Sequence, residues 1–198
     1  TGSLAERAPA FFELYGDRGV TVGNPDLISE HRFGYDFGLR SAGSVGAFSA
    51  ALTYGFFDRE IADLITFVEN GLGVSVPQNL ASASLLGHEI GAHLDWENAI
   101  GLSFNYLRLA ARDQSGDTRG DWHQLPNRSA DQLDATLTAG WGWFSLSYHV
   151  DAIGPFYLDA QEQRPMPGRI RQDVGLQIQP DWGWRPVLDV QLQNITDN

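Results

Sequence analysis

The chain has 198 residues, of which 42% are hydrophobic and 19% charged, enough for one large domain or for part of a longer protein. The absence of cysteine excludes a disulfide scaffold and a thiolate metal site, and the absence of any run of about 18 apolar residues excludes a transmembrane helix. The formal net charge of −12 argues against a nucleic-acid partner, and it either solubilises the protein or attracts cationic or metal-bearing ligands.

Hydrophobic and polar residues alternate along most of the chain, as they do in strands whose two faces meet different surroundings. The first full strand is expected over 31–41, and a turn at 41–44 leads to a returning strand over 45–57. A long connection over 58–82 precedes the next strand, 83–96, in which the apolar face runs from Leu86 to Trp96.

The second half of the chain continues the same pattern. The remaining expected strands are 100–112, 131–141, 144–157, 169–179 and 186–194. Short turns at 97–99, 141–143 and 180–183 alternate with polar loops at 113–130 and 158–168. The alternation loses phase at 107–111, which indicates a β-bulge.

Eight full strands in four hairpins, preceded by a partial strand, make up this pattern. Each is near the roughly 9–11 residues that a tilted transmembrane strand needs. One face is apolar, the other is polar, and the connections alternate between short and long. These features predict an all-β fold, an antiparallel transmembrane β-barrel portion of about eight to nine strands with lipid outside and a wet lumen inside.

Tryptophan positions predict the orientation of the barrel. Those near the short turns are Trp96, Trp141, Trp143, Trp182 and Trp184. Indole rings prefer the membrane interface, so five at one level form a girdle. The short turns are then periplasmic and the long loops extracellular. Trp122 is the one tryptophan in a long loop, where ligand contact or loop packing is expected.

Six short motifs follow one another along the chain: ERAP at 6–9, ELYG at 13–16, GNPDL at 23–27, DLI at 63–65, GHEIGA at 87–92 and the closing LQNITDN at 192–198. In this order they resemble the C-terminal half of TonB-dependent outer-membrane receptors. The resemblance implies a 22-stranded barrel with an N-terminal plug, energised through TonB, in the outer membrane of a Gram-negative bacterium. It also implies import of a scarce nutrient such as a siderophore-type metal chelate.

The chain shows no signal peptide, no plug, no TonB box and no final strand with a terminal aromatic residue. We therefore expect residues 1–198 to be one partial receptor barrel domain. Eight or nine strands of a wide barrel leave two unpaired edges, which predicts a curved, incompletely closed sheet that alone neither inserts stably nor transports.

Candidate ligand contacts lie in the extracellular loops and lumen. They are Asp17, Asn24, Asp26, Trp122, His123 and Arg128. No catalytic residue, metal site or cofactor is expected. Glu89, His93 and Asp95 share a face but span about 20 Å, which is too far for one metal site. Ser147 and His149 lie about 7 Å apart along a strand, so a nucleophile–base hydrogen bond is not expected.

The expected partners are outer-membrane lipid, the TonB complex through the missing plug, and a small-molecule or metal-chelate substrate, with no nucleic acid. Two alternatives remain open at this point. One is a self-contained small eight-stranded outer-membrane barrel with a structural role, and the other is a soluble β-sandwich that binds sugars.

Overall fold

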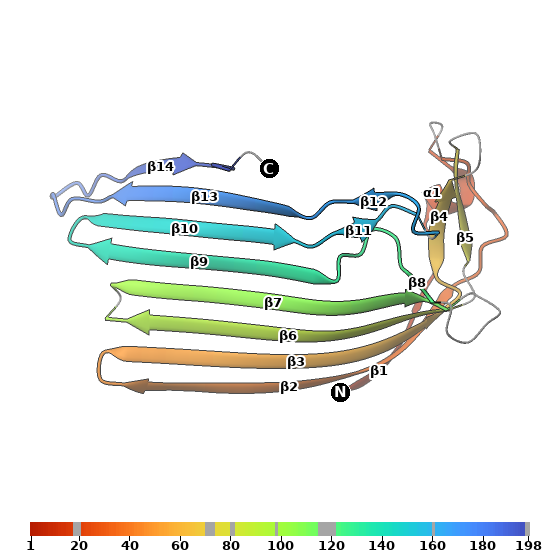
Figure 1. Cartoon of the computed structure of the whole chain (residues 1–198), viewed down its shortest axis with the longest axis horizontal. Helices are drawn as coiled ribbons and strands as arrows, with labels where there is room; N and C mark the ends of the chain where they lie inside the picture. The colour runs from red at the N-terminus through yellow and green to blue at the C-terminus, as the bar shows by residue number, and fades with distance from the viewer. Residues whose placement is uncertain are drawn as a thin grey trace.

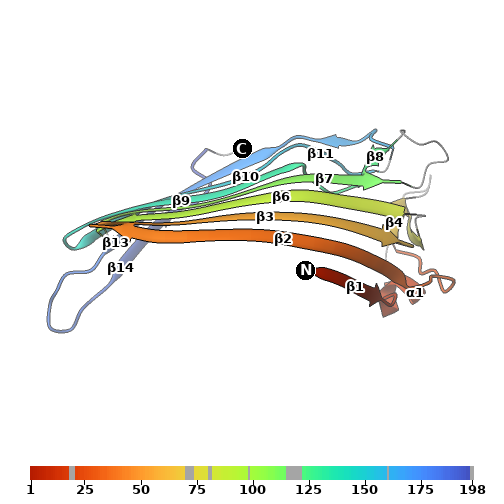
Figure 2. The ribbon, with the colours of Figure 1, turned by 90° about the horizontal axis from the view of Figure 1, so that it is seen from below.

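The alternating strands assemble into one curved antiparallel sheet (Figures 1 and 2). The computed structural model describes residues 1–17, 21–69, 74–79, 82–97, 99–114, 122–159 and 161–196. The strands of the main sheet are, in spatial order, β1 (Gly2–Arg7), β2 (Glu30–Val45), β3 (Phe48–Ala62), β6 (Ser82–Trp96), β7 (Ile100–Asp113), β9 (Asp131–Trp141), β10 (Phe144–Ile153), β13 (Arg169–Ile178) and β14 (Leu188–Leu192). The partial first strand and the eight full strands of the sequence prediction are thus confirmed.

The smaller elements gather at one end of the sheet, which we call the loop end (Figure 1). They are α1 (Phe11–Tyr15), the hairpin of β4 (Ile65–Glu69) and β5 (Ser75–Asn79), β8 (His123–Gln124), and the pair β11 (Phe156–Tyr157) and β12 (Pro165–Met166). The short connections lie at the opposite end, the turn end. Among the described residues, no helix has the length and apolar character needed to cross a bilayer.

The sheet is open, as expected from the sequence. The nine strands named above run in a single path from β1 to β14, with the short β8 paired to β7 beside this path, and the described edge strands β1 and β14 do not pair with each other. The main sheet is also a single layer, since the other two sheets have two strands each. A barrel needs closure, so this part of the chain supplies only an arc of one.

The strand registers assign each side chain to one of two faces. Leu137 on β9 lies opposite Leu102 on β7 and Tyr148 on β10, so these apolar residues share a face, which we call the outer face. Thr136 and His149 lie on the other, inner face, which is lined with Ser, Thr, Asn and Asp. The outer face leaves large apolar side chains exposed along every long strand, which fits lipid contact.

Tyrosines mark the outer face towards the loop end. Tyr54 bonds His88 Nδ1 at 2.8 Å, and Tyr106 donates to an Asp131 carboxylate oxygen at 2.5 Å. His88 lies two residues nearer the loop end than Ile90, which is directly opposite Tyr54. Asp131 likewise lies two residues nearer the loop end than Leu133, which is directly opposite Tyr106. Tyr35 and Tyr148 also bond polar partners on the neighbouring strand. Each ring thus lies beside apolar neighbours while its hydroxyl is satisfied, as at a membrane interface.

The five tryptophans of the predicted girdle lie at the turn end. Trp96 and Trp141 end strands β6 and β9, and Trp143 lies in the β9–β10 turn. Trp182 and Trp184 lie in the β13–β14 connection with their rings 5.9 Å apart. All five are exposed, so the tryptophan and tyrosine levels bound the apolar band of the outer face from its two ends.

The predicted turn at 41–44 is wrong. β2 continues to Val45, which pairs with Phe48, so the chain reverses at Gly46 and Ala47. Gly46 has a φ of +58°, a conformation that glycine adopts without the steric penalty of a side chain. Small and polar residues in the preceding segment therefore belong to a strand rather than to the turn.

The predicted bulge at 107–111 is also wrong. β7 keeps an unbroken register with β6 from Ile100 to Asp113. Leu107, Leu109 and Ala111 remain on the inner face, and Leu109 and Ala111 are buried in a core cluster with Leu125 of the following loop. Hydrophobic and polar residues stop alternating here because the loop that carries Leu125 covers the inner face of β7. The inner-face residues at these positions are therefore buried and apolar.

Other boundaries shift by a few residues. The long connection over 58–82 is shorter than expected, because β3 runs to Ala62, and it contains the β4–β5 hairpin. β10 ends at Ile153 rather than 157, and the last strand covers Leu188–Leu192 within the expected 186–194. Residue 98 of the expected turn lies outside the described residues.

Two glycines explain the GHEIGA motif. A Cβ at Gly87 would lie 2.2 Å from the ring of Phe57, which is directly opposite it on β3. A Cβ at Gly91 would lie 2.3 Å from Thr53 Oγ1, again directly across the strand pair. On the inner face, the Phe57 and Thr53 side chains of β3 therefore lie over the backbone of β6. Glycine at positions 87 and 91 leaves room for this close approach.

Candidate ligand-binding site

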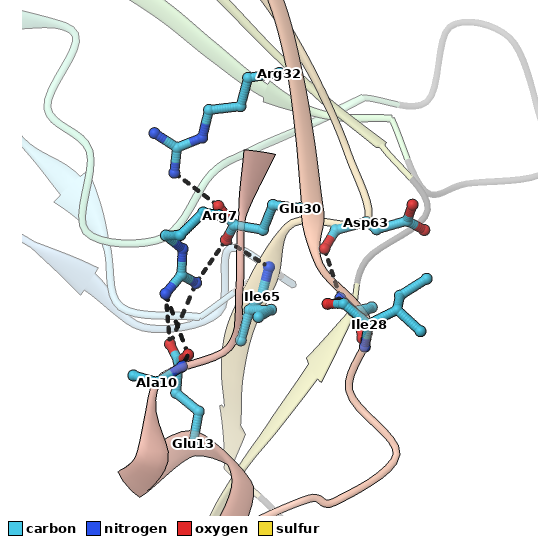
Figure 3. A network of polar contacts seen from close by, with 9 residues as sticks. Arg7, Ala10, Glu13, Ile28, Glu30, Arg32, Asp63 and Ile65 are labelled. Atoms are coloured by element: carbon cyan, nitrogen blue, oxygen red, sulfur yellow. Dashed lines mark hydrogen bonds and ion pairs between the residues drawn. The ribbon is translucent and has the colours of Figure 1, made fainter. Parts of the chain in front are cut away.

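A polar network centred on Glu30 ties the loops to the rim of the sheet (Figure 3). Glu30 begins β2, its side chain is 0% exposed, and it accepts hydrogen bonds from Arg7 and Arg32, both at 2.7 Å. It also accepts the backbone N–H of Ile65 at 3.0 Å, which fixes the start of β4. One carboxylate therefore joins β1, β2 and the β4–β5 hairpin.

Arg7 extends the network to α1. Its guanidinium donates to both carboxylate oxygens of Glu13 at 3.1–3.2 Å. Glu13 in turn accepts the N–H of Ala10 at 2.6 Å, and this bond caps the short helix. Charge-assisted bonds in a forked geometry are strong and directional, so α1 is held in one position beside β2.

The electrostatics of this network favour the ionised carboxylate. Burial by itself would raise the pKa of Glu30, but the hydrogen bonds from Arg7, Ile65 N–H and Arg32 outweigh it and hold that pKa at about 2. The two carboxylates raise the pKa of Arg7 in return. Glu30 and Arg7 are therefore both charged at neutral pH.

The segment 21–29 and the hairpin are joined by backbone and amide contacts. Asn79 donates to the carbonyls of Ile28 and Asp63 and accepts the N–H of Ile28. Asn24 donates to the Pro77 carbonyl at 3.0 Å. We call α1, the segment 21–29 and the β4–β5 hairpin the loop unit, because these contacts hold them together.

The loop unit carries an aromatic cluster. Phe12 of α1 stacks on Phe67 of β4 with ring centroids 5.9 Å apart and planes 1° apart. Phe11 and Tyr15 form a second pair with centroids 4.8 Å apart. All four rings are exposed, Phe11 by 78%. Exposed aromatic rings on a fixed support are suited to contact a flat or apolar part of a ligand.

A second cluster surrounds β8. The Arg112 guanidinium lies 5.2 Å from the centre of the Trp122 ring, within cation–π range. His123 Nδ1 lies 3.9 Å from a Glu162 carboxylate oxygen, and Glu162 also accepts the N–H of Gln124 at 2.6 Å. These contacts link the β7–β9 loop to the β10–β13 loop.

The inner face below the loops is polar and ionic. His149 bonds Thr136 Oγ1 at 3.0 Å and lies 3.5 Å from an Asp134 carboxylate oxygen. Asp151 lies directly opposite Asp134 and pairs with Arg169 at 3.7 Å. A hollow of about 320 Å³ lies over this face, lined among others by Glu89, Asn105, Gln132, Asp134 and Asp151. Such a surface fits a wet lumen.

The six candidate contacts of the sequence prediction fall into two groups. Asp17 and Asn24 shape the β1–β2 loop, since Asp17 accepts the N–H of Thr21 at 3.2 Å and Asn24 accepts that of Asp26 at 3.1 Å. Asp26 is exposed. Trp122 and His123 belong to the second cluster, and the exposed Arg128 contributes its carbonyl to Gln124. Ligand contact by any of the six stays a prediction.

Sequence reasoning missed the residues that organise the loop unit. Arg7, Glu13 and Glu30 lie within or beside the quoted motifs but were not chosen as site residues. The adjacent Phe11 and Phe12 were a usable signal, because two consecutive phenylalanines in a polar loop invite an explanation. Their stacking partner Phe67 lies 55 positions beyond Phe12 in the chain and becomes apparent only in the fold.

Neither a nucleophile–base pair nor a cluster of metal ligands is formed by the described residues. Ser147 donates to the Gly175 carbonyl at 3.5 Å, whereas His149 contacts Thr136 and Asp134, so the serine and the histidine do not act on each other. Within the described part of the chain, no three His, Asp or Glu side chains converge as metal ligands.

Comparison with known proteins identifies the architecture. A family model described as "TonB dependent receptor-like, beta-barrel" matches residues 3–195. The structure is similar to the copper transporter OprC (TM-score 0.73, 18% identity, all of this chain and 30% of that one). It is also similar to FyuA, the ferric yersiniabactin uptake receptor from Yersinia pestis (0.66, 16%, 87% of this chain and 26% of that one).

A third similar structure is BauA, the ferric preacinetobactin receptor from Acinetobacter baumannii (TM-score 0.64, 15% identity, all of this chain and 30% of that one). The chain thus spans about a third or less of the length of these proteins. No curated protein sequence matches it. At these identities the likeness establishes the fold.

Proposed function

The chain belongs to the TonB-dependent receptor-like β-barrel family, and from this premise we propose that it forms part of the barrel of an outer-membrane importer of a metal or metal chelate. In this proposal residues 1–198 are one partial barrel domain, and uptake is energised through TonB by a plug. The location in the outer membrane of a Gram-negative bacterium is part of the same proposal.

The observation that carries the proposal is the division of the sheet into two faces and two ends. The outer face has an apolar band between tyrosines and tryptophans, and the inner face has ion pairs and amides. Lipid on one side and a hydrated passage on the other explain both faces. The long loops at the tyrosine end then lie outside the cell, where they meet the substrate first.

The loop unit supports a role in substrate capture. Its aromatic cluster is exposed, while its polar network fixes the cluster relative to the rim. We propose that Phe11, Phe12 and Phe67 contact the organic part of a metal chelate. The surrounding loops supply the remaining proposed contacts, which are Asp17, Asn24, Asp26, Trp122, His123 and Arg128. Capture and passage require no enzymatic step, and we propose none.

The two alternatives receive less support. A small eight-stranded barrel requires its first and last strands to pair, but β1 and β14 do not. A β-sandwich requires a second sheet over the apolar face, and the main sheet has no such layer among the described residues.

Metal uptake by the full-length protein tests the proposal. A deletion strain complemented with the full-length gene is grown under iron or copper limitation with a panel of labelled ferric chelates and copper. We expect restored uptake of at least one of these, abolished when TonB is deleted. Uptake that is unchanged by the gene, or that persists without TonB, would refute the proposal.

Substrate binding by two phenylalanine variants tests the proposed role of the aromatic cluster in capture. Phe12→Ala removes one ring of the stacked pair in the loop unit, and Phe37→Ala removes a similarly exposed ring from the outer face. We expect Phe12→Ala to weaken substrate binding about tenfold, the effect of losing one aromatic contact, with Phe37→Ala close to wild type. Equal affinities for both variants would contradict a role of the cluster in capture.

A further inference from the structure

The β4–β5 hairpin of the loop unit has two strand edges, and other parts of the loop unit cover the edge of β5. The N–H of Val22 donates to the Ser75 carbonyl at 3.0 Å, and the side-chain amide of Asn24 donates to the Pro77 carbonyl at 3.0 Å. These two carbonyls therefore point away from β4 and towards the segment 21–29. Proteins usually cover or blunt a strand edge, because its unpaired groups invite pairing with another chain.

The register of the hairpin shows which backbone groups of β4 point outwards. Pro77 lies directly opposite Phe67. In an antiparallel pair, opposite residues direct their N–H and C=O groups either towards each other or away from each other. Because the Pro77 carbonyl points away from β4, the N–H and C=O of Phe67 point away from β5. The N–H of Ile65, two residues earlier, points to the same side and donates to Glu30 at 3.0 Å (Figure 3).

Phe67 is the open position of this edge. Within the described part of the chain, no group accepts its N–H or donates to its C=O. An unpaired N–H is costly when it is buried, but Phe67 is 40% exposed, so these groups are available to water or to a ligand. The Phe67 ring stacks on Phe12, which adds an exposed apolar surface at the same residue. An extended peptide uses both features, because its backbone pairs with the edge and its side chains need apolar contacts.

The start of β4 is held in place before any ligand binds. The Ile65 N–H is bonded to Glu30, whose side chain is 0% exposed and paired with two arginines. The Asn79 side chain donates to the Asp63 carbonyl at 2.6 Å from the other strand of the hairpin. An edge that is already ordered loses little conformational freedom when a ligand adds to it, so its hydrogen bonds contribute more fully to affinity.

We propose that the free edge of β4 at Phe67 binds the peptide backbone of the substrate, which is then a metal chelate with an extended peptide segment. The Phe67 N–H donates to a carbonyl of this segment, the Phe67 C=O accepts one of its N–H groups, and the rings of Phe12 and Phe67 contact its apolar side chains. The inference rests on the proposed role of the loop unit in capture, and it names the chemical class of the captured chelate.

Two matched probes test the site in the full-length protein, purified in detergent. One is the ferric complex of a linear trihydroxamate that carries a three-residue aliphatic peptide tail, and the other is the same complex with every tail amide N-methylated. The two probes share the iron centre, the charge and the side chains, but the methylated tail has no N–H for the Phe67 carbonyl. We expect the unmethylated probe to bind about tenfold more tightly. Equal affinities would overturn the proposal.

Two variants separate the backbone of Phe67 from its ring. Phe67→Ala and Phe67→Pro both remove the ring, but only proline removes the N–H at the free edge. Proline is tolerated there because an outward N–H takes no part in the ladder with β5. We expect Phe67→Ala to bind both probes more weakly and to keep the preference of about tenfold, and Phe67→Pro to lose this preference.

An unchanged preference in Phe67→Pro would contradict the proposed backbone contact. Exchange protection of the Val68 amide, which faces β5, shows whether the hairpin remains intact in this variant. If that protection is lost, the comparison of the two probes on wild type decides alone.

The remaining outcomes separate the chelate from a plain peptide, and the site from the proposed function. The metal-free form of the unmethylated probe should bind at least about tenfold more weakly than its ferric complex, and equal binding would overturn the chelate as the occupant. Absence of binding by both ferric probes would overturn the site. Uptake is measured in parallel: TonB-dependent uptake without a preference for the unmethylated tail overturns only the site, whereas wild type that takes up no metal complex refutes the proposed function, and a preference in detergent would still support the site.

Discussion

Replacing Glu30 by glutamine tests whether one buried carboxylate holds the loop unit on the sheet. The substitution keeps the shape of the side chain and removes its charge. The new amide oxygen can take the place of Oε1, which accepts from the Ile65 N–H and from Arg7. The amide NH₂ group then takes the place of Oε2 and turns a donor towards the Arg32 guanidinium, and both arginines lose their anionic partner. Breaking a buried ion pair by removing one member is strongly destabilising, because the remaining charge is uncompensated.

The free energy that the loop unit loses in Glu30→Gln follows from the pKa of the carboxylate. That pKa falls from 4.5 to about 2 in the folded protein. One pKa unit corresponds to about 1.4 kcal/mol, so the ionised form of Glu30 stabilises the folded loop unit by about 3 kcal/mol at neutral pH. Loss of this contribution increases local opening about a hundredfold.

Amide hydrogen exchange of the full-length protein in detergent measures this opening directly. In Glu30→Gln we expect the amides of β4, including Ile65, to exchange about a hundredfold faster, while those of β9 and β10 are unchanged. Glu60→Gln, an exposed glutamate on the outer face, is the matched control and should leave β4 as in wild type. Exchange of Ile65 within about threefold of wild type in Glu30→Gln would refute the reasoning.

Four further predictions concern the same network, the two faces, the orientation and the GHEIGA motif. Because the pKa of Glu30 is lowered, its contribution is complete above about pH 4.5 and is lost as the pH falls through 2, so exchange protection of β4, corrected for intrinsic rates, should be flat from pH 7 to 5 and decline below. Leu137→Arg on the outer face should lower the free energy of unfolding in vesicles by about 2–4 kcal/mol, and Thr136→Arg on the inner face by less; equal losses would indicate that both faces are buried. Cysteine introduced at Gln161 of the β10–β13 connection should be labelled by an impermeant reagent on intact cells, whereas cysteine at Ala47 of the β2–β3 turn should not, and the reverse result would invert the orientation. Gly87→Val, whose Cβ would lie 2.2 Å from the Phe57 ring, should cost about 1–3 kcal/mol from overpacking in denaturant unfolding, and Gly43→Val, with open space around it, should cost less; equal stability of the two variants would show that the ring moves aside freely.

Several features of the fold could be predicted because they depend on local periodicity. Alternation in 83–96 and 131–141 placed strands within one residue of β6 and β9, since a strand with two different surroundings needs a residue of each kind at every second position. The tryptophans near the short turns likewise marked one end of the sheet without any knowledge of its neighbours. The open edges followed from the resemblance to TonB-dependent receptors, which implies a barrel of many more strands than the eight or nine counted here.

The errors arose where a local pattern had a distant cause. The bulge was inferred from lost alternation at 107–111, but the true reason is Leu125, a loop residue that covers the inner face there. The turn was placed on Ser and Gly residues at 41–44, although the conformation that only glycine accepts without cost occurs at Gly46. Propensity alone does not distinguish these positions, because small residues also occur on a strand's wet face.

The candidate site shows most clearly the difference between features set by neighbouring residues and features set by distant contacts. The sequence by itself determined that most of this chain forms antiparallel alternating strands, which of their faces is apolar, and at which end the long loops lie, because each depends on residues close together in the chain. Only the tertiary structure decided that Arg7, Glu13 and Glu30 meet in one buried network, and that Phe12 stacks on Phe67. These contacts join residues up to 55 positions apart, and they depend on how the strands align and how the loops fold back over the rim.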